Sequence, residues 1–239
     1  MGDNRGRMGQ PGVAQAFEPG ARAGSAARRC DVLDSHSRDL IVPTGRIVAY
    51  DPFYCVDAPA IVREVPLGRY PVLLALAQFA RNGDERIASA MLRLRDAAPV
   101  RWEPAVWTRN SANASPDTDA EEEPTDMTTA TDSTPIANAY CVDSGFGAFM
   151  DEAAIEALLD HIEAEDDDDY LQRRLDALGP AGGPEWFNIP LDEETGANIL
   201  LFSSGWGDGK YPSFWGFAAD GDPICLLTDL GVVDDAGFL

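Results

Sequence analysis

The residues best suited to chemistry lie in three loops that combine glycine with carboxylate or aromatic side chains. The first loop contains Asp51 between a tyrosine and a proline, and Asp143 opens the second, which ends at Gly147. The third loop spans residues 203–212. Glycine at this density lets the backbone approach a ligand closely or adopt a positive φ. The candidate ligand-binding residues of the three loops are Asp51, Asp143, Ser204, Trp206, Asp208 and Tyr211.

The aspartates of these loops have a metal-binding interpretation and a structural one. Carboxylate oxygens are the ligands that hard divalent cations prefer, and Asp151 adds a fourth such group shortly after the second loop. In the structural interpretation, Asp51 and Asp143 stabilise turns and Asp151 caps a helix. The calcium-loop pattern D-x-[DN]-x-[DN]-G is absent. We therefore favour the structural interpretation and expect no metal and no cofactor.

Other catalytic signatures are missing from the sequence. Ser144 lacks the flanking glycines of a nucleophile elbow, and Lys210 is followed by Tyr211 rather than by the Ser or Thr of a phosphate loop. The two histidines are His36, near the N-terminus, and His161, among acidic residues. Histidine-dependent acid–base catalysis thus has few groups to use, and we assign no catalytic residue.

Short apolar segments separated by turn residues precede and follow the second loop. Pro66–Gly68 and Asn82–Gly83 are of the residue types that reverse a chain. The pattern predicts a meander of strands, although residues 70–80 and 85–95 contain enough Ala and Leu to be helical instead. The predicted strands before the third loop are residues 45–53, 61–65, 70–79, 86–94, 100–107 and 137–142.

One helix is predicted after the second loop. Ile155, Leu158, Leu159 and Ile162 form an apolar stripe with helical spacing, and Asp151 stands where it can cap the first turn. The acidic run 166–169 ends this helix, and residues 170–178 resume it.

The last 50 residues predict a three-stranded antiparallel unit over residues 197–203, 211–218 and 223–230. Asp220–Gly221 between the last two strands is typical of a type I′ hairpin turn. The whole order favours an α+β fold, a predominantly antiparallel β-sheet with one or two helices packed on one face.

The sequence predicts a single domain over residues 39–239. Residues 1–38 are rich in Gly, Ala and Arg without hydrophobic periodicity, so we expect a disordered tail. Residues 110–134 are Ser, Thr, Asp, Glu and Pro with almost no apolar side chains, so we expect a disordered acidic insert. No apolar stretch is long enough for a membrane span or a secretory signal, and the four cysteines show no C-x-x-C spacing. We expect a cytoplasmic protein with reduced thiols.

Charge divides the chain into two unequal parts. Residues 1–109 contain 15 basic and 12 acidic residues, a net charge of +3, whereas residues 110–239 contain 3 basic and 29 acidic residues, a net charge of −26. This charge repels nucleic acid and anionic lipid, so we expect neither as a direct partner, and it accelerates encounter with a cationic protein. Solubility or a salt-rich habitat is the alternative explanation. The predicted partner contacts are Glu156, Asp160, Glu163, Asp166, Asp167, Asp168 and Asp169.

Five motifs in order resemble a known bacterial family, the domain of unknown function 4241. They are Thr44–Pro52, Pro66–Val72, Trp102–Glu103, Val142–Gly145 with Phe149–Asp151, and Ser204–Pro212. The resemblance covers roughly residues 40–239 without the acidic insert, and it implies a fold more than a function.

Small acidic bacterial proteins with few motifs are similar, by analogy, to immunity proteins that neutralise a secreted toxin. We therefore expect a binding protein whose partner is a cognate basic toxin domain, for example a nuclease. One alternative is a hydrolase or metal-dependent enzyme that uses Asp51, Asp143 and Asp208. A second alternative is a small-ligand sensor domain.

Overall fold

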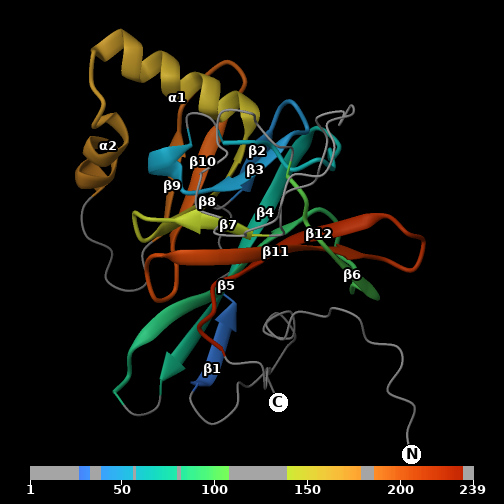
Figure 1. Cartoon of the computed structure of the whole chain (residues 1–239). Coiled ribbons are helices and arrows are strands. Elements are labelled where there is room, and N and C mark those ends of the chain that lie inside the picture. The colour runs from blue at the N-terminus through green and yellow to red at the C-terminus, as the bar shows by residue number, and fades with distance from the viewer. Residues whose placement is uncertain are drawn as a thin grey trace, which may run out of the picture.

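The computed structural model describes residues 27–32, 39–55, 58–79, 82–107, 139–178 and 186–233. Within these ranges the chain forms two antiparallel β-sheets and two α-helices, α1 (Glu152–Glu165) and α2 (Tyr170–Leu178) (Figure 1). The predicted α+β class is confirmed.

The larger sheet has the strand order β1-β4-β5-β12-β11-β6, with β2 also paired to β4 and β7 also paired to β11. Its strands are β1 (Ala27–Val32), β2 (Asp39–Val42), β4 (Gly68–Phe79), β5 (Glu85–Arg93), β6 (Arg101–Pro104), β7 (Ala139–Val142), β11 (Gly209–Phe217) and β12 (Pro223–Asp229). The smaller sheet has the order β3-β8-β10-β9. Its strands are β3 (Ile47–Tyr50), β8 (Phe146–Asp151), β9 (Trp186–Pro190) and β10 (Asn198–Ser203).

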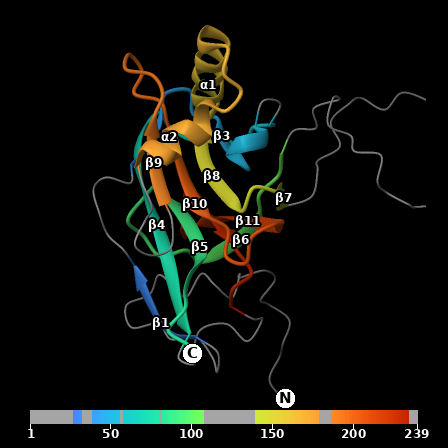
Figure 2. The ribbon, with the colours of Figure 1, turned by 90° about the vertical axis from the view of Figure 1, so that its left-hand side faces the viewer.

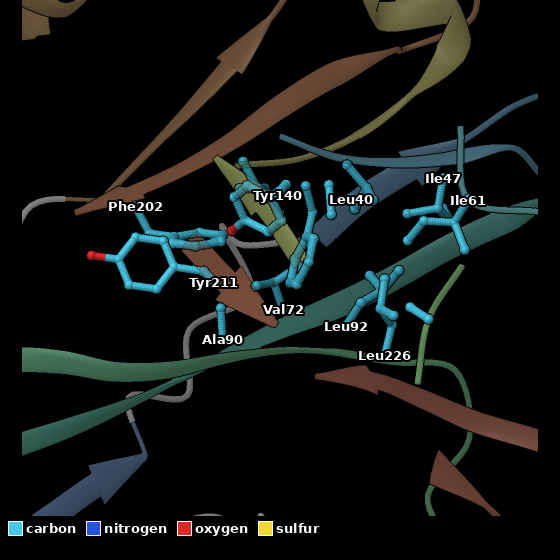
Figure 3. Packing of buried hydrophobic residues seen from close by; sticks show 14 of the residues in the cluster. Leu40, Ile47, Ile61, Val72, Ala90, Leu92, Tyr140, Phe202, Tyr211 and Leu226 are labelled. Carbon is cyan, nitrogen blue, oxygen red and sulfur yellow. The ribbon is translucent and has the colours of Figure 1, made fainter. Parts of the chain in front are cut away.

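The main core lies between the two sheets (Figure 3). Phe149 of β8 and Phe202 of β10 belong to one buried cluster with residues of the larger sheet such as Leu92 and Leu226. Figure 3 shows part of this cluster, including Phe202, Leu92 and Leu226. Side chains along a strand alternate between its two faces. The residues next to Phe149 and Phe202 in the sequence, such as Met150, therefore point to the opposite face of the smaller sheet. These neighbours pack against the buried faces of α1 and α2. Figure 2 shows both helices at one end of the molecule, beside the smaller sheet. The predicted placement of helices on one sheet face is confirmed.

The α1 helix follows its sequence pattern. Asp151 is the N-cap, and its side chain accepts a hydrogen bond from the backbone N–H of Ala153. Ala154, Ile155 and Leu158 are buried. The helix ends at Asp166, whose left-handed backbone (φ 49°) is a conformation that aspartate tolerates better than most side chains do. The helices in the described part of the chain are too short or too polar to span a membrane.

The predicted three-stranded C-terminal unit is wrong. β11 and β12 form a hairpin, but β10 belongs to the other sheet, between β8 and β9. Residues 61–65 also do not form a strand, since the one bridge there joins Ile61 to Trp107. Apolar segments of this length predict strands but carry no information about the sheet in which each strand pairs.

Two local predictions also need correction. Residues 27–32, assigned to the disordered tail, form strand β1 on the edge of the larger sheet. The β11–β12 turn is not type I′, which needs a positive φ at both central residues. Gly221 has φ 90°, whereas among the described non-glycine residues Asp166 alone has a positive φ. The remaining tail and the insert at 110–134 lie outside the described residues.

Candidate functional site

Asp51 is the centre of the contacts between the first two loops. It is 1% exposed, at the end of β3 and at the start of the 3₁₀ turn η2 (Pro52–Tyr54). Its Oδ2 accepts hydrogen bonds from the backbone N–H groups of Asp143 (2.9 Å) and Ser144 (2.8 Å). Its Oδ1 accepts from the Ser144 hydroxyl (2.7 Å) and the Phe53 N–H (3.0 Å). The two oxygens of a carboxylate have about four acceptor positions, so protein donors occupy them all.

The second loop continues this network to the third loop. The carbonyl oxygen of Gly145 accepts a hydrogen bond from the Ser204 N–H at 2.9 Å. The Ser204 hydroxyl in turn donates to the Gly207 carbonyl at 2.8 Å. The Tyr211 hydroxyl shares its one proton between the carbonyls of Ser204 (2.8 Å) and Gly207 (2.6 Å). The structure therefore brings the three predicted loops together and fixes each one to the next.

Asp143 and Asp208 lie at one end of the β7–β11 ladder. The last pair of that ladder is Val142 with Gly209, so the two aspartates are the next residues on either strand. Both are exposed. Asp151 lies elsewhere, because it pairs with Ile47 at the start of β3, whereas Asp51 follows the end of that strand. The predicted set of four aspartates is thus not assembled at one point.

Trp206 is the most exposed aromatic group of the third loop, at 57%. The Arg86 guanidinium lies over its ring, 4.3 Å from the centroid, and Phe79 contacts it with 5.6 Å between centroids. Arg86 also donates to the Gly205 carbonyl at 2.8 Å. This loop therefore holds an exposed tryptophan in a fixed position on the β4–β5 end of the larger sheet.

The two tyrosines near these loops, Tyr50 and Tyr211, are not suited to proton transfer at neutral pH. Burial, followed by the charges of Cys141, Asp51 and Asp143, raises the pKa of Tyr50. Burial and the nearby Asp208 likewise raise the pKa of Tyr211. Both phenols stay protonated near neutral pH. Across the described residues, no three His, Cys, Asp or Glu side chains are grouped so that they could hold a metal ion. The main role that the geometry gives Asp51, Ser144, Ser204 and Tyr211 is to anchor loops.

The predicted partner contacts lie on α1 and on the turn into α2. Glu156, Asp160 and Glu163 are exposed and spaced by four and three residues, so they share one helix face. The opposite face of α1 is buried against the smaller sheet. Residues 152–178 contain ten acidic and two basic residues, a net charge of −8. We define the α1–α2 acidic surface as the exposed residues Glu156, Asp160, Glu163, Glu165, Asp166, Asp168 and Asp169.

Asp167 differs from its acidic neighbours. Its Oδ1 accepts from the Asp169 N–H at 3.0 Å, and its Oδ2 bonds to the guanidinium of Arg173. Arg173 also pairs with Glu165 at 2.6 Å. Asp167 therefore shapes the turn between the helices. Considering only interactions between described residues, it is the one predicted contact whose carboxylate is engaged within the protein.

A feature that the sequence analysis missed joins the two sheets. Asn198 is 3% exposed, and its Oδ1 accepts from the Ile41 N–H at 2.8 Å. Its amide nitrogen donates to the Asp39 carbonyl (3.0 Å) and to Asn188 Oδ1 (2.7 Å). One side chain thus replaces a strand partner along the edge of β2. A polar residue at the start of the buried apolar segment 199–202 was the signal available in the sequence.

A cleft of about 510 Å³ opens beside Asn198, where β2, β4, β9 and β10 meet. It has the size of many small-molecule sites. The candidate residues of the three glycine-rich loops do not line it. The lining residues are Asp39, Ile41, Arg69, Asn188, Pro190, Gly196 and Asn198.

The cysteines give a prediction about thiol reactivity. Cys55, Cys141 and Cys225 are free thiols. Burial raises the pKa of Cys55 and of Cys225 to about 12, so these two remain protonated across the physiological range. Cys141 is exposed. Iodoacetamide at about pH 8 should label Cys141 and leave Cys55 and Cys225 unlabelled until the protein unfolds. Peptide mass spectrometry measures this, and rapid labelling of Cys55 in the folded protein would contradict it.

Comparisons with the curated proteins and with the solved structures find no match. The model of one protein family matches residues 40–228. This range contains the five motifs named above, the smaller sheet, both helices and the larger sheet apart from β1 and the end residues Asp39 and Asp229. The chain therefore belongs to the family described as "Protein of unknown function (DUF4241)".

Proposed function

We propose that this protein is an acidic binding protein, an immunity protein that neutralises a cognate basic toxin domain such as a nuclease by direct contact. The observation that carries the proposal is the stripe of Glu156, Asp160 and Glu163. These side chains are exposed, and within the described residues no Lys or Arg pairs with them. Uncompensated charge on a rigid helix face attracts a cationic surface and orients it before contact.

Arginines in the loops beside the larger sheet contrast with this stripe. Arg95 pairs with Asp220 and Asp222, and Arg63 lies 3.9 Å from Glu103. These pairs offset charge there, whereas the α1 stripe contributes a negative field that no Lys or Arg of the described residues offsets. The same field disfavours nucleic acid and anionic membranes as direct partners. The protonated thiols of Cys55 and Cys225 suit the reducing cytoplasm in which we place the protein.

The enzyme alternative has less support. It rests on Asp51, Asp143 and Asp208 as a group, and Asp51 is committed to four protein donors. A carboxylate so engaged is a poor base and a poor metal ligand, because both roles need a free lone pair.

The test uses the product of the gene next to this one as the immobilised partner, and the proposal requires that product to be a basic protein. The variant Asp160→Asn with Glu163→Gln removes two charges from the acidic surface. We expect its association rate to fall roughly 3- to 10-fold at about 50 mM salt, and the difference to shrink at about 500 mM salt, where charges are screened. Surface plasmon resonance measures both rates.

A matched control distinguishes an effect of this surface on the association rate from an effect of the net charge of the protein. Glu64→Gln with Asp96→Asn removes two exposed charges away from the helices and should leave the association rate nearly unchanged. Equal losses in both variants, or an association rate indifferent to salt, would show that the α1–α2 acidic surface is not the binding site.

A further inference from the structure

In the cleft beside Asn198, two oppositely charged side chains lie close together without forming a hydrogen bond. The Arg69 guanidinium lies 3.7 Å from the Asp39 carboxylate, too far for a hydrogen bond. The Arg69 side chain is 68% exposed and that of Asp39 is 23% exposed. Within the described part of the chain, Asp39 is the one charged partner of Arg69. Both groups therefore keep hydrogen-bonding capacity that faces the cleft.

The rest of the cleft is rigid and partly apolar. Asn198 fixes the edge of β2 through the backbone of Asp39 and Ile41, and so it holds the backbone that carries the Asp39 carboxylate in place. Ile41 and Pro190 supply apolar lining. Gly196, with φ 76°, leaves space beside Ile41, because a Cβ there would lie 3.6 Å from the Ile41 side chain. The cleft thus combines a cation, an anion and an apolar wall.

We infer that this cleft binds a small zwitterion, an α-amino acid or a short peptide with an apolar side chain. The ligand carboxylate bonds to Arg69, whose planar guanidinium matches two carboxylate oxygens. The ligand ammonium bonds to Asp39, and the apolar side chain lies on Ile41 and Pro190. The two charges of an α-amino acid are about as close as those of the Arg69–Asp39 pair, so one ligand exchanges a loose ion pair for two charge-assisted hydrogen bonds.

The experiment titrates the ¹⁵N-labelled full chain with L-leucine and follows backbone amide shifts. We expect saturable shifts at the amides of Ile41 and Gly196, with a Kd between roughly 10 μM and 1 mM, as suits a ligand of so few atoms. Leucinamide lacks the carboxylate and N-acetylleucine lacks the ammonium, and each should bind at least about 10-fold more weakly. L-aspartate should also bind more weakly, because the cleft wall is apolar.

Two variants assign each ligand group to its protein partner. Arg69→Gln should weaken leucine binding about 10-fold but leave leucinamide binding as it was. Asp39→Asn should weaken leucine binding and leave N-acetylleucine binding as it was. Both side chains are at least partly exposed, so we expect both variants to fold. Melting temperatures near that of the parent protein would show that they do. Arg101→Gln and Asp96→Asn, which remove like charges elsewhere, are the matched controls.

Several outcomes would overturn the inference. One is the absence of saturable shifts with leucine and with leucine-containing dipeptides. Another is binding that Arg69→Gln and Asp39→Asn leave unchanged. N-acetylleucine that binds as tightly as leucine would show a carboxylate site rather than a zwitterion site. These results are independent of the partner-binding measurement on α1, so either proposal can fail alone.

Discussion

Replacing Asp51 with asparagine should destabilise the fold by about 3–5 kcal/mol, because a buried carboxylate would be lost as the charged acceptor of two backbone N–H groups. The carboxylate accepts from the N–H groups of Asp143 and Ser144 on one oxygen and from two more donors on the other. The amide nitrogen of asparagine would face donors with a donor. For a chain of this size the loss corresponds to roughly 6–20 °C in the melting temperature.

Urea unfolding followed by tryptophan fluorescence measures this change. Asp143→Asn is the matched control, because the side chain of Asp143 is exposed and we expect a change below about 0.5 kcal/mol. If Asp51 were instead a catalytic group held in a strained state, its replacement would leave stability unchanged or increase it. A stable, well-folded Asp51→Asn protein would therefore remove the loop-anchoring interpretation and restore the enzyme alternative.

The substitution Asn198→Ala should have the second large effect. We expect it to lower the free energy of unfolding by about 2–4 kcal/mol. The substitution leaves the Ile41 N–H and the Asp39 carbonyl without their partner at the junction of the sheets. It also creates a small cavity in a position that is 3% exposed. The same unfolding experiment measures the loss.

A control for Asn198 is available on the neighbouring strand. Asn188→Ala removes the acceptor that one Asn198 N–H uses, but it leaves both bonds to β2 in place. We expect this variant to lower the free energy of unfolding by about 1 kcal/mol. If both variants lower the free energy of unfolding by the same amount, the hydrogen bonds from Asn198 to the backbone of β2 do not hold the sheets together.

The features that local patterns determine were predictable from the sequence. The apolar stripe and the Asp151 cap of α1 depend on residues within a few positions of each other, and the structure has both. The strands β4 and β5 were predicted with helix as the alternative, and the 12 residues of β4 are long for a strand. Its side chains are buried on both faces, which removes the polar alternation that would have identified it.

Pairing between distant segments was not predictable. β10 lies beside β8 and β9 rather than beside β11, and nothing within residues 197–203 distinguishes the two sheets. Asp51 has the same limitation, because three of its four hydrogen bonds come from donors on residues 92 and 93 positions further along the chain. The sequence analysis named the loops through their glycines and aspartates, but the saturation of the Asp51 carboxylate depends on how β3, β7 and β8 meet.

The cleft was missed for a similar reason. Asp39, Arg69 and Asn188 come from three separate strands and form no motif in the sequence. The acidic surface, by contrast, lies within one helix and the turn after it, so the sequence alone was enough to name Glu156, Asp160 and Glu163 as partner contacts.

Carboxylate footprinting of the complex tests the proposed partner surface most directly. Carbodiimide and glycine ethyl ester label accessible carboxylates, and mass spectrometry locates the label in the free protein and in the complex with the adjacent basic gene product. The proposal predicts that Glu156, Asp160 and Glu163 lose most of their label in the complex, whereas the exposed Asp143 and Asp208 keep theirs. Loss of label at Asp143 and Asp208 with α1 unchanged would contradict the proposal and place the partner on the glycine-rich loops.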